Sequence, residues 1–238
     1  MREIPIRDIT THDDNCVRRV PIFAGLTPAQ QDLVATMARP QMLDNGELVH
    51  GVGERTGKMF VVHSGQVKLH RVLPSGRKLL LRVAQPGETV GEHAFLTSSP
   101  TLDEAEAMDG TRLCVFVHDD LADLFQRYPD IAHRMLRTLG DRLAQTEHQL
   151  VLNTQSVDVR LADYLLQQPV LPNSPAGGFT TVRLPLEKKD VASLLGTTPE
   201  SFSRALARFR AKGLISVEDD TITLRDLDAL EDLVAGDV

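Results

Sequence analysis

Tryptophan is absent from this 238-residue sequence, and only 4% of its residues are aromatic. The hydrophobic residues, 42% of the chain, are therefore mostly aliphatic, and they are enough to fill one or two domain cores. No run of about eighteen apolar residues is present, so neither a membrane-spanning helix nor a membrane partner is expected. Because the N-terminal residues also lack an apolar signal core, we expect a cytoplasmic protein.

The sequence also has few of the features on which catalysis commonly depends. Cysteine occurs only twice, as Cys16 and Cys114, and a cysteine pair in a cytosolic protein more often serves redox or metal chemistry than structure. There is no Gly-x-Ser-x-Gly motif, no Walker-type phosphate loop and no zinc-protease helix motif. We therefore expect that the protein is not an enzyme.

The net charge of −7 is unusual for a DNA-binding protein, but the charge is unevenly distributed. Residues 183–213 contain seven basic and three acidic residues, whereas residues 214–238 contain eight acidic residues and one arginine. A basic segment within an acidic chain can bind phosphate locally while the overall charge limits non-specific association. An ordinary solvated helix face is the alternative interpretation.

The residues around Gly196 have the pattern of a helix-turn-helix. Glycine permits the left-handed backbone that ends a helix, here a helix expected over residues 187–195. Thr198 can cap the next helix, expected over residues 199–212, with Pro199 at its first position. We therefore predict that the second of these helices enters the major groove of DNA.

The flanking segments complete the order of a winged helix-turn-helix. A strand is expected over residues 180–184, and an acidic hairpin over residues 214–224 follows the two helices. Residues 226–234 are expected to form a closing helix.

Between residues 41 and 117, short apolar runs alternate with glycine-containing turns. Many short strands at regular spacing predict a small barrel or sandwich. The expected strands are residues 59–62, 67–72, 78–83 and 112–117, and the expected turns are residues 44–47, 63–65, 74–76 and 85–88.

A long helix is predicted to begin at Pro129 and to carry a mostly apolar stripe for about five turns. The stripe recurs at steps of four and three residues, at Ile131, Met135, Leu139, Leu143, Thr146 and Leu150. Packing on its own domain is one interpretation. We favour a seam between two parallel helices, and hence a homodimer.

This order of a β-rich domain, a long helix and a winged helix-turn-helix resembles the CRP/FNR superfamily of bacterial transcription regulators. The resemblance covers nearly the whole chain, and its most specific motifs are PGETVGE at residues 86–92 and DVASLLGTTPESFSR at residues 190–204. It implies an α+β fold in four parts. They are an N-terminal arm (1–19), a cyclic-nucleotide-binding-type β-roll (20–128), a dimerisation helix (129–157) and a winged helix-turn-helix domain (158–238).

The family's Glu-x-x-Ser-Arg reading pattern is matched by Glu200, Ser203 and Arg204, and it implies half-sites like TTGAT. Arg204 can donate to guanine, and Glu200 can accept from a cytosine amino group. Compensation of the helix dipole is the alternative role of Glu200. The candidate DNA-binding residues are Thr198, Glu200, Ser201, Ser203, Arg204, Arg208, Lys188 and Lys189. Among them, Thr198, Lys188 and Lys189 are the candidates for phosphate contacts.

Gly91 and Glu92 resemble the family's ribose-contacting pair. The family's cyclic-nucleotide binders place an arginine and a serine or threonine about ten residues further on, to pair with the phosphate. Here residues 101–106 read TLDEAE, and their three carboxylates oppose a phosphate. We therefore do not expect cyclic AMP as the effector, and another small ligand stays open.

The two cysteines are placed as in the FNR-like subgroup with two cysteines. Cys114 matches the single later cysteine of the family's iron–sulfur sensors. Those sensors have three cysteines near the N-terminus, whereas this sequence has only Cys16 there. One chain therefore cannot supply the four thiolates of such a cluster. The resemblance implies a reversible Cys16–Cys114 disulfide. His12 precedes Cys16 by four residues and His118 follows Cys114 by four, so zinc or a histidine-ligated iron–sulfur centre is a second interpretation. A plain buried cysteine beside surface histidines is the third.

These features together predict a homodimeric transcription regulator that binds a palindromic operator in double-stranded DNA, with RNA polymerase as a further partner. Redox state or a metal at the N-terminal arm and β-roll is expected to control it. The alternative is a ligand- or metal-binding module whose helix-turn-helix is non-functional.

Overall fold

The computed structural model describes residues 17, 20, 23, 25–171 and 179–236. The chain forms two compact units, Met1–Arg142 and Leu143–Val238, and the boundary between them falls inside helix α4 (Pro129–Leu152). Across the described ranges, no helix is both long enough and apolar enough to cross a membrane.

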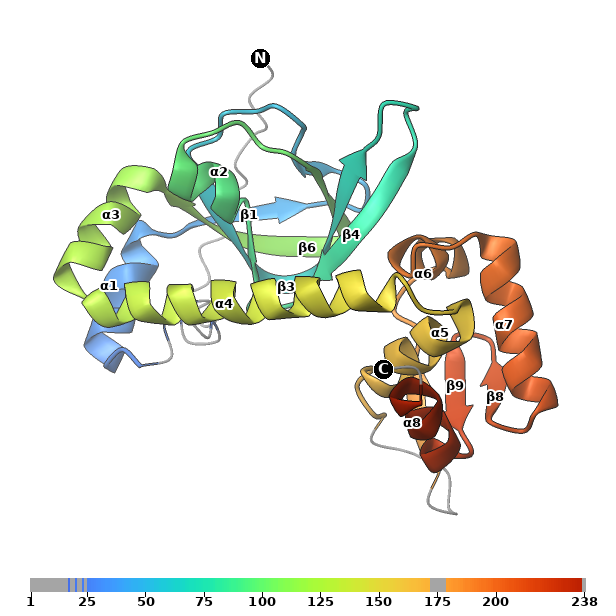
Figure 1. Cartoon of the computed structure of the whole chain (residues 1–238). Coiled ribbons are helices and arrows are strands. Elements are labelled where there is room, and N and C mark those ends of the chain that lie inside the picture. The colour runs from blue at the N-terminus through green and yellow to red at the C-terminus, as the bar shows by residue number, and fades with distance from the viewer. Residues whose placement is uncertain (1–16, 18–19, 21–22, 24, 172–178, 237–238) are drawn as a thin grey trace. The chain divides into compact units, whose positions relative to one another are not determined.

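The N-terminal unit is built on a curled antiparallel sheet (Figure 1). Its main path has the order β1-β6-β3-β4, while β2 pairs with β6 and β5 pairs with β3. The strands are β1 (Arg39–Leu43), β2 (Leu48–His50), β3 (Lys58–Val72), β4 (Lys78–Ala84), β5 (Thr89–Val90) and β6 (Glu104–Val117). The predicted β-roll is therefore confirmed.

One predicted turn is wrong, because residues 63–65 lie inside the continuous 15-residue strand β3. The β3–β6 register shifts between Val62 and Ser64 and again between Ser64 and Gln66, so this segment is a bulge. Gly65 adopts φ +79°, and a Cβ there would lie 2.7 Å from the Cα of Thr111. The glycine thus permits the close approach of two strands and does not reverse the chain.

Two clusters of buried side chains fill the N-terminal unit. One cluster lies among the strands and includes Leu69, Ala105 and Ala107. The other includes Phe23, Val34, Phe116 and Leu124. It brings together strand residues with α1 (Pro28–Met37), α3 (His118–Arg127) and the first turns of α4, and α2 (Glu92–Thr97) contributes Phe95.

The C-terminal unit has the predicted winged helix-turn-helix order. Its sheet has the order β7-β9-β8. The elements are α5 (Val157–Leu166), β7 (Thr180–Arg183), α6 (Lys188–Leu194), α7 (Pro199–Ala211), β8 (Ile215–Glu218), β9 (Thr221–Leu224) and α8 (Leu227–Ala235). Buried Val182, Ile215 and Ile222 from the three strands form part of its core.

Candidate DNA interface and control region

The turn between α6 and α7 has the backbone that its glycine predicts. Gly196 adopts φ +59°, and its N–H donates to the carbonyl oxygen of Ser193. Arg160 of α5 donates from Nη1 to the carbonyl oxygens of Leu195 and Gly196, at 2.5 and 3.3 Å. The turn is therefore held both by its own hydrogen bonds and by a neighbouring helix.

Helix α7 begins as the sequence predicts. The Thr198 hydroxyl accepts a hydrogen bond from the backbone N–H of Ser201, and Pro199 occupies the first turn. The helix is amphipathic, because one face carries only apolar side chains into the core: Phe202, Ala205, Leu206 and Phe209. This burial fixes which face of α7 remains available to a partner.

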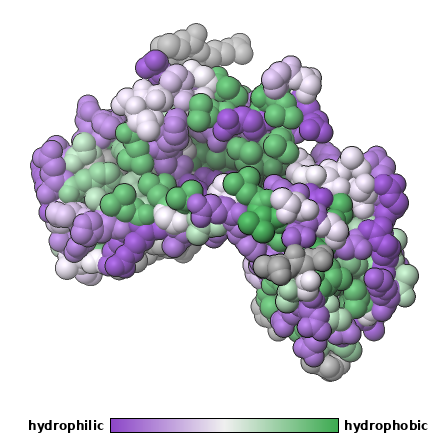
Figure 2. Space-filling model, viewed as in Figure 1, coloured by the Kyte–Doolittle hydropathy of each residue, from purple (hydrophilic) through white to green (hydrophobic). Residues whose placement is uncertain are grey.

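The remaining face of α7 is polar and exposed (Figure 2). Glu200, Ser203 and Arg204 are exposed on it, and Ser201 is half-buried. Arg204 donates to the Ser201 hydroxyl at 2.9 Å. The pKa of Glu200 is lowered by a hydrogen bond from its own backbone N–H, by the Thr198 hydroxyl and by the charge of Arg204. Glu200 is therefore a carboxylate, and a hydrogen-bond acceptor, at neutral pH.

Three basic residues among the DNA-binding candidates are exposed, but two of them already have partners. Lys188 and Lys189 lie at the start of α6, and Lys189 forms an ion pair with Glu187 at 2.8 Å. Arg208 of α7 is paired with Asp158 of α5 through two hydrogen bonds. A phosphate contact by Arg208 would therefore require an exchange of partner.

In the N-terminal unit, Glu92 is buried at the first turn of α2 and contacts two arginines. Its carboxylate accepts a hydrogen bond from Arg142 of α4 and from the Thr89 hydroxyl, and Arg82 of β4 lies 3.6 Å away. Burial and the charge of Arg142 lower the pKa of Arg82, while the charge of Glu92 acts in the opposite sense. Glu92 therefore stabilises two guanidinium groups that would otherwise repel each other.

The three carboxylates of residues 101–106 do not face one common site in the structure. Glu104 and Glu106 alternate along β6 with the buried Ala105, so both point to the face of the strand that is opposite the alanine. Both lie within ion-pair distance of Lys78. Asp103 instead lies 3.9 Å from the imidazole of the buried His50. The three acidic groups thus belong to two different environments.

Cys114 is buried on β6. Its predicted partner Cys16 and the predicted ligand His12 lie outside the described residues. His118 is exposed at the start of α3, and its Nδ1 lies 3.1 Å from the carbonyl oxygen of Phe95.

The predicted seam along α4 divides into two parts. Ile131 and Met135 are buried in the core of their own chain, so they are not available to a second chain. By contrast, Leu143 and Leu150 are 60% and 63% exposed. Leu136, which the predicted apolar stripe does not include, is 65% exposed. Leu139 is half-buried and Thr146 is exposed. Apolar patches accordingly interrupt the hydrophilic surface where α4 crosses the view (Figure 2).

Each of the two units matches a known protein family. Residues 40–128 match the family of cyclic nucleotide-binding domains, and residues 159–233 match the Crp-like helix-turn-helix domain. The "CRP-like cAMP-activated global transcriptional regulator" of Mycobacterium tuberculosis is 28% identical over 91% of this chain and 97% of the relative. The "Nitrogen fixation regulation protein FixK" of Bradyrhizobium diazoefficiens is 26% identical over 94% of this chain and 93% of the relative.

Solved structures show the same architecture. The catabolite activator protein of Thermus thermophilus is 25% identical, with a TM-score of 0.52, over 91% of this chain and 99% of its own. FixK2 from Bradyrhizobium japonicum, at 24% identity and a TM-score of 0.69, shares the fold over 82% of this chain and 96% of its own.

A β-roll, a long helix and a winged helix-turn-helix with a polar exposed face on α7 define a DNA-binding transcription regulator and not an enzyme. The chain belongs to the CRP/FNR superfamily of these regulators.

Proposed function

We propose that this regulator reads a palindromic operator with TTGAT-like half-sites through Glu200, Ser203 and Arg204. The observation that carries the proposal is the polar face of α7, on which these three exposed side chains lie opposite a fully apolar buried face. An arginine can donate two hydrogen bonds to guanine, and a carboxylate can accept one from cytosine. Thr198, Ser201, Lys188, Lys189 and Arg208 are the proposed residues for backbone and phosphate contacts.

The proposed active form is a homodimer, since a palindrome requires two recognition helices about 34 Å apart. Support comes from Leu136, Leu143 and Leu150, which are exposed on α4 and separated by seven residues each. This spacing is that of one position in a coiled-coil heptad, and Leu139 and Thr146 fall at the second apolar position. RNA polymerase is the proposed further partner of the DNA-bound dimer.

For control, we propose the oxidation state of the cysteine pair and not cyclic AMP. The position of Cys114 on β6, where the resemblance places the later cysteine, supports a redox role, with Cys16 as the proposed partner. Against cyclic AMP, residues 93–111 contain no lysine or arginine to pair with a phosphate. Arg82 and Arg142 are engaged by Glu92.

Fluorescence anisotropy with a labelled TTGAT palindrome tests the reading function, with a scrambled palindrome of the same length as the control. We expect the specific operator to bind about a thousandfold or more tightly than the control at fixed salt. Equal affinity for both duplexes in the oxidised and the reduced protein would favour a ligand- or metal-binding module whose helix-turn-helix is non-functional.

Control is tested by the same titration with and without a dithiol reductant, and with and without cyclic AMP. We expect the reductant to change the operator affinity of the wild type and to leave that of Cys114→Ser unchanged. We expect cyclic AMP to leave the operator affinity of both proteins unchanged. Metal analysis after anaerobic purification distinguishes the alternative site of His12, Cys16, Cys114 and His118, because that site predicts stoichiometric zinc or iron in the reduced protein.

A further inference from the structure

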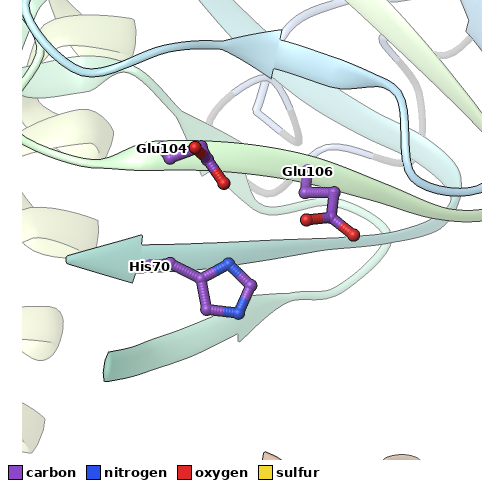
Figure 3. Close-up of side chains that lie close together, drawn as sticks. All are labelled: His70, Glu104 and Glu106. Carbon is purple, nitrogen blue, oxygen red and sulfur yellow. The ribbon is translucent and has the colours of Figure 1, made fainter. Parts of the chain in front are cut away.

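A second group of potential metal ligands lies on the β-roll, and it includes no cysteine. His70 on β3 is paired in register with Glu104 on β6, and Glu106 follows two residues further along the same strand. Their neighbours Leu69, Ala105 and Ala107 belong to the buried cluster, so the three side chains share the opposite face of the ladder. Figure 3 shows the imidazole of His70 facing the two carboxylates.

The donor atoms of these three residues are close enough to surround one ion. One imidazole nitrogen and one oxygen from each carboxylate all lie within 4.8 Å of one another. Because zinc–ligand distances are about 2.0–2.2 Å, small side-chain rotations would bring all three donors onto one ion. His70 is only 8% exposed, whereas the side chains of Glu104 and Glu106 are 16% and 29% exposed, so an ion could enter from the carboxylate side.

A positive charge already occupies this carboxylate pair. The Lys78 ammonium donates a hydrogen bond to Glu104 and lies 4.0 Å from Glu106. The Lys78 side chain is nearly half exposed, at 48%, and can move into solvent when another cation takes its place.

We propose that His70, Glu104 and Glu106 form a binding site for a divalent transition-metal ion, best matched by Zn²⁺, with Lys78 as an internal competitor. An imidazole with two carboxylates suits Zn²⁺, whereas Mg²⁺ prefers oxygen ligands and retains its water. The three protein ligands leave a fourth position for water. This site depends on neither the cysteine pair nor the DNA-reading function.

Isothermal titration calorimetry with Zn²⁺ tests the site in the full-length oxidised protein and in four variants. Circular dichroism first verifies that each variant is folded. Wild-type protein is expected to bind one Zn²⁺ per chain at this site, and His70→Gln is expected to weaken that binding by about tenfold or more. Glu104→Gln, which keeps the size of the side chain, is a second test of the same ligand set. The matched control is His93→Gln, because His93 is an exposed histidine of the same unit.

Replacing Lys78, the proposed competitor, should change the Zn²⁺ affinity in the opposite direction. Lys78→Met removes the ammonium but keeps an unbranched side chain, so it is expected to tighten Zn²⁺ binding while the other two variants weaken it. The proposal is overturned if His70→Gln and Glu104→Gln bind Zn²⁺ like the wild type, if Lys78→Met weakens binding, or if Mg²⁺ binds as tightly as Zn²⁺.

Discussion

Arg160 of α5 donates a hydrogen bond to the carbonyl oxygen of Leu195, the C-cap residue of α6. This places a guanidinium group against the C-terminal end of a helix, where backbone carbonyls lack intrahelical partners and carry partial negative charge. The same group also reaches the carbonyl of Gly196. The position of the turn that precedes the recognition helix therefore depends on a residue outside the helix-turn-helix itself.

Replacing this arginine by alanine should lower both stability and operator affinity. Loss of a hydrogen bond from a charged donor costs about 1.5–3 kcal/mol of unfolding free energy, which urea titration can measure. Operator affinity should fall although no base-contacting side chain has changed. Arg160→Lys, which keeps one charged donor, should recover part of both quantities. If Arg160→Ala unfolds like the wild type, the proposed role is wrong.

Arg204→Ala should abolish the preference for the TTGAT palindrome without changing the oligomeric state. A bidentate contact to guanine contributes about 1–3 kcal/mol of discrimination per half-site. The measurement is anisotropy against specific and scrambled duplexes at fixed salt. Arg210→Ala, a change at an exposed arginine of the same helix, serves as the control. Undiminished discrimination by Arg204→Ala would refute the proposed reading pattern.

Leu143→Glu should convert the proposed dimer into a monomer. Leu143 is 60% exposed in the single chain, so the substitution costs little within the chain but would bury two like charges between two chains. Sedimentation velocity measures the change directly. Val72→Glu introduces the same charge at another exposed apolar position, and it should leave the dimer intact. A dimer that survives Leu143→Glu would exclude this part of α4 from the interface.

Glu92→Gln should destabilise the β-roll by about 1–3 kcal/mol, because it leaves the guanidinium groups of Arg82 and Arg142 without their shared carboxylate. Glu88→Gln is a matched control, since Glu88 also lies within ion-pair distance of Arg82 but is about half exposed. An exposed pair of this kind contributes at most about 1 kcal/mol. Equal effects of the two variants on urea unfolding would show that the buried carboxylate has no special role.

Tyr164→Phe should change how stability responds to alkaline pH. Burial raises the pKa of the Tyr164 phenol to about 12, above the value of about 10 in an unfolded chain. The folded state therefore holds this proton more tightly, and the stability that this provides below pH 10 is lost as the pH rises from about 10 to about 12.

Urea midpoints measured across that range should consequently fall less steeply in Tyr164→Phe than in the wild type. At neutral pH the variant should be at least as stable, because Tyr164 Oη has no hydrogen-bond partner among the described residues. An unchanged slope in Tyr164→Phe would contradict the assignment.

The parts of the fold that depend on local chemistry were predictable. The cap at Thr198, the positive φ of Gly196 and the order of the winged helix-turn-helix follow from neighbouring residues, and the structure confirms them. The turn predicted at residues 63–65 failed because the role of Gly65 is set by Thr111, which is distant in sequence. A glycine in a β-rich sequence does not reveal whether it turns the chain or lets two strands approach.

The side-chain groupings of the β-roll were less predictable, for the same reason. Glu92 gave a motif match, but its partners Arg82 and Arg142 lie on other elements and belong to no motif. Glu104 and His70 meet only through the register of β3 and β6. A one-residue shift in that register would place the two side chains on opposite faces.

The spacing of Leu136, Leu143 and Leu150 has a consequence for the handedness of a dimer. A straight α-helix has 3.6 residues per turn, so residues that repeat every seven positions drift by about 20° per heptad around its axis. Two copies of α4 that keep all three leucines in contact must therefore wind around each other in a left-handed supercoil.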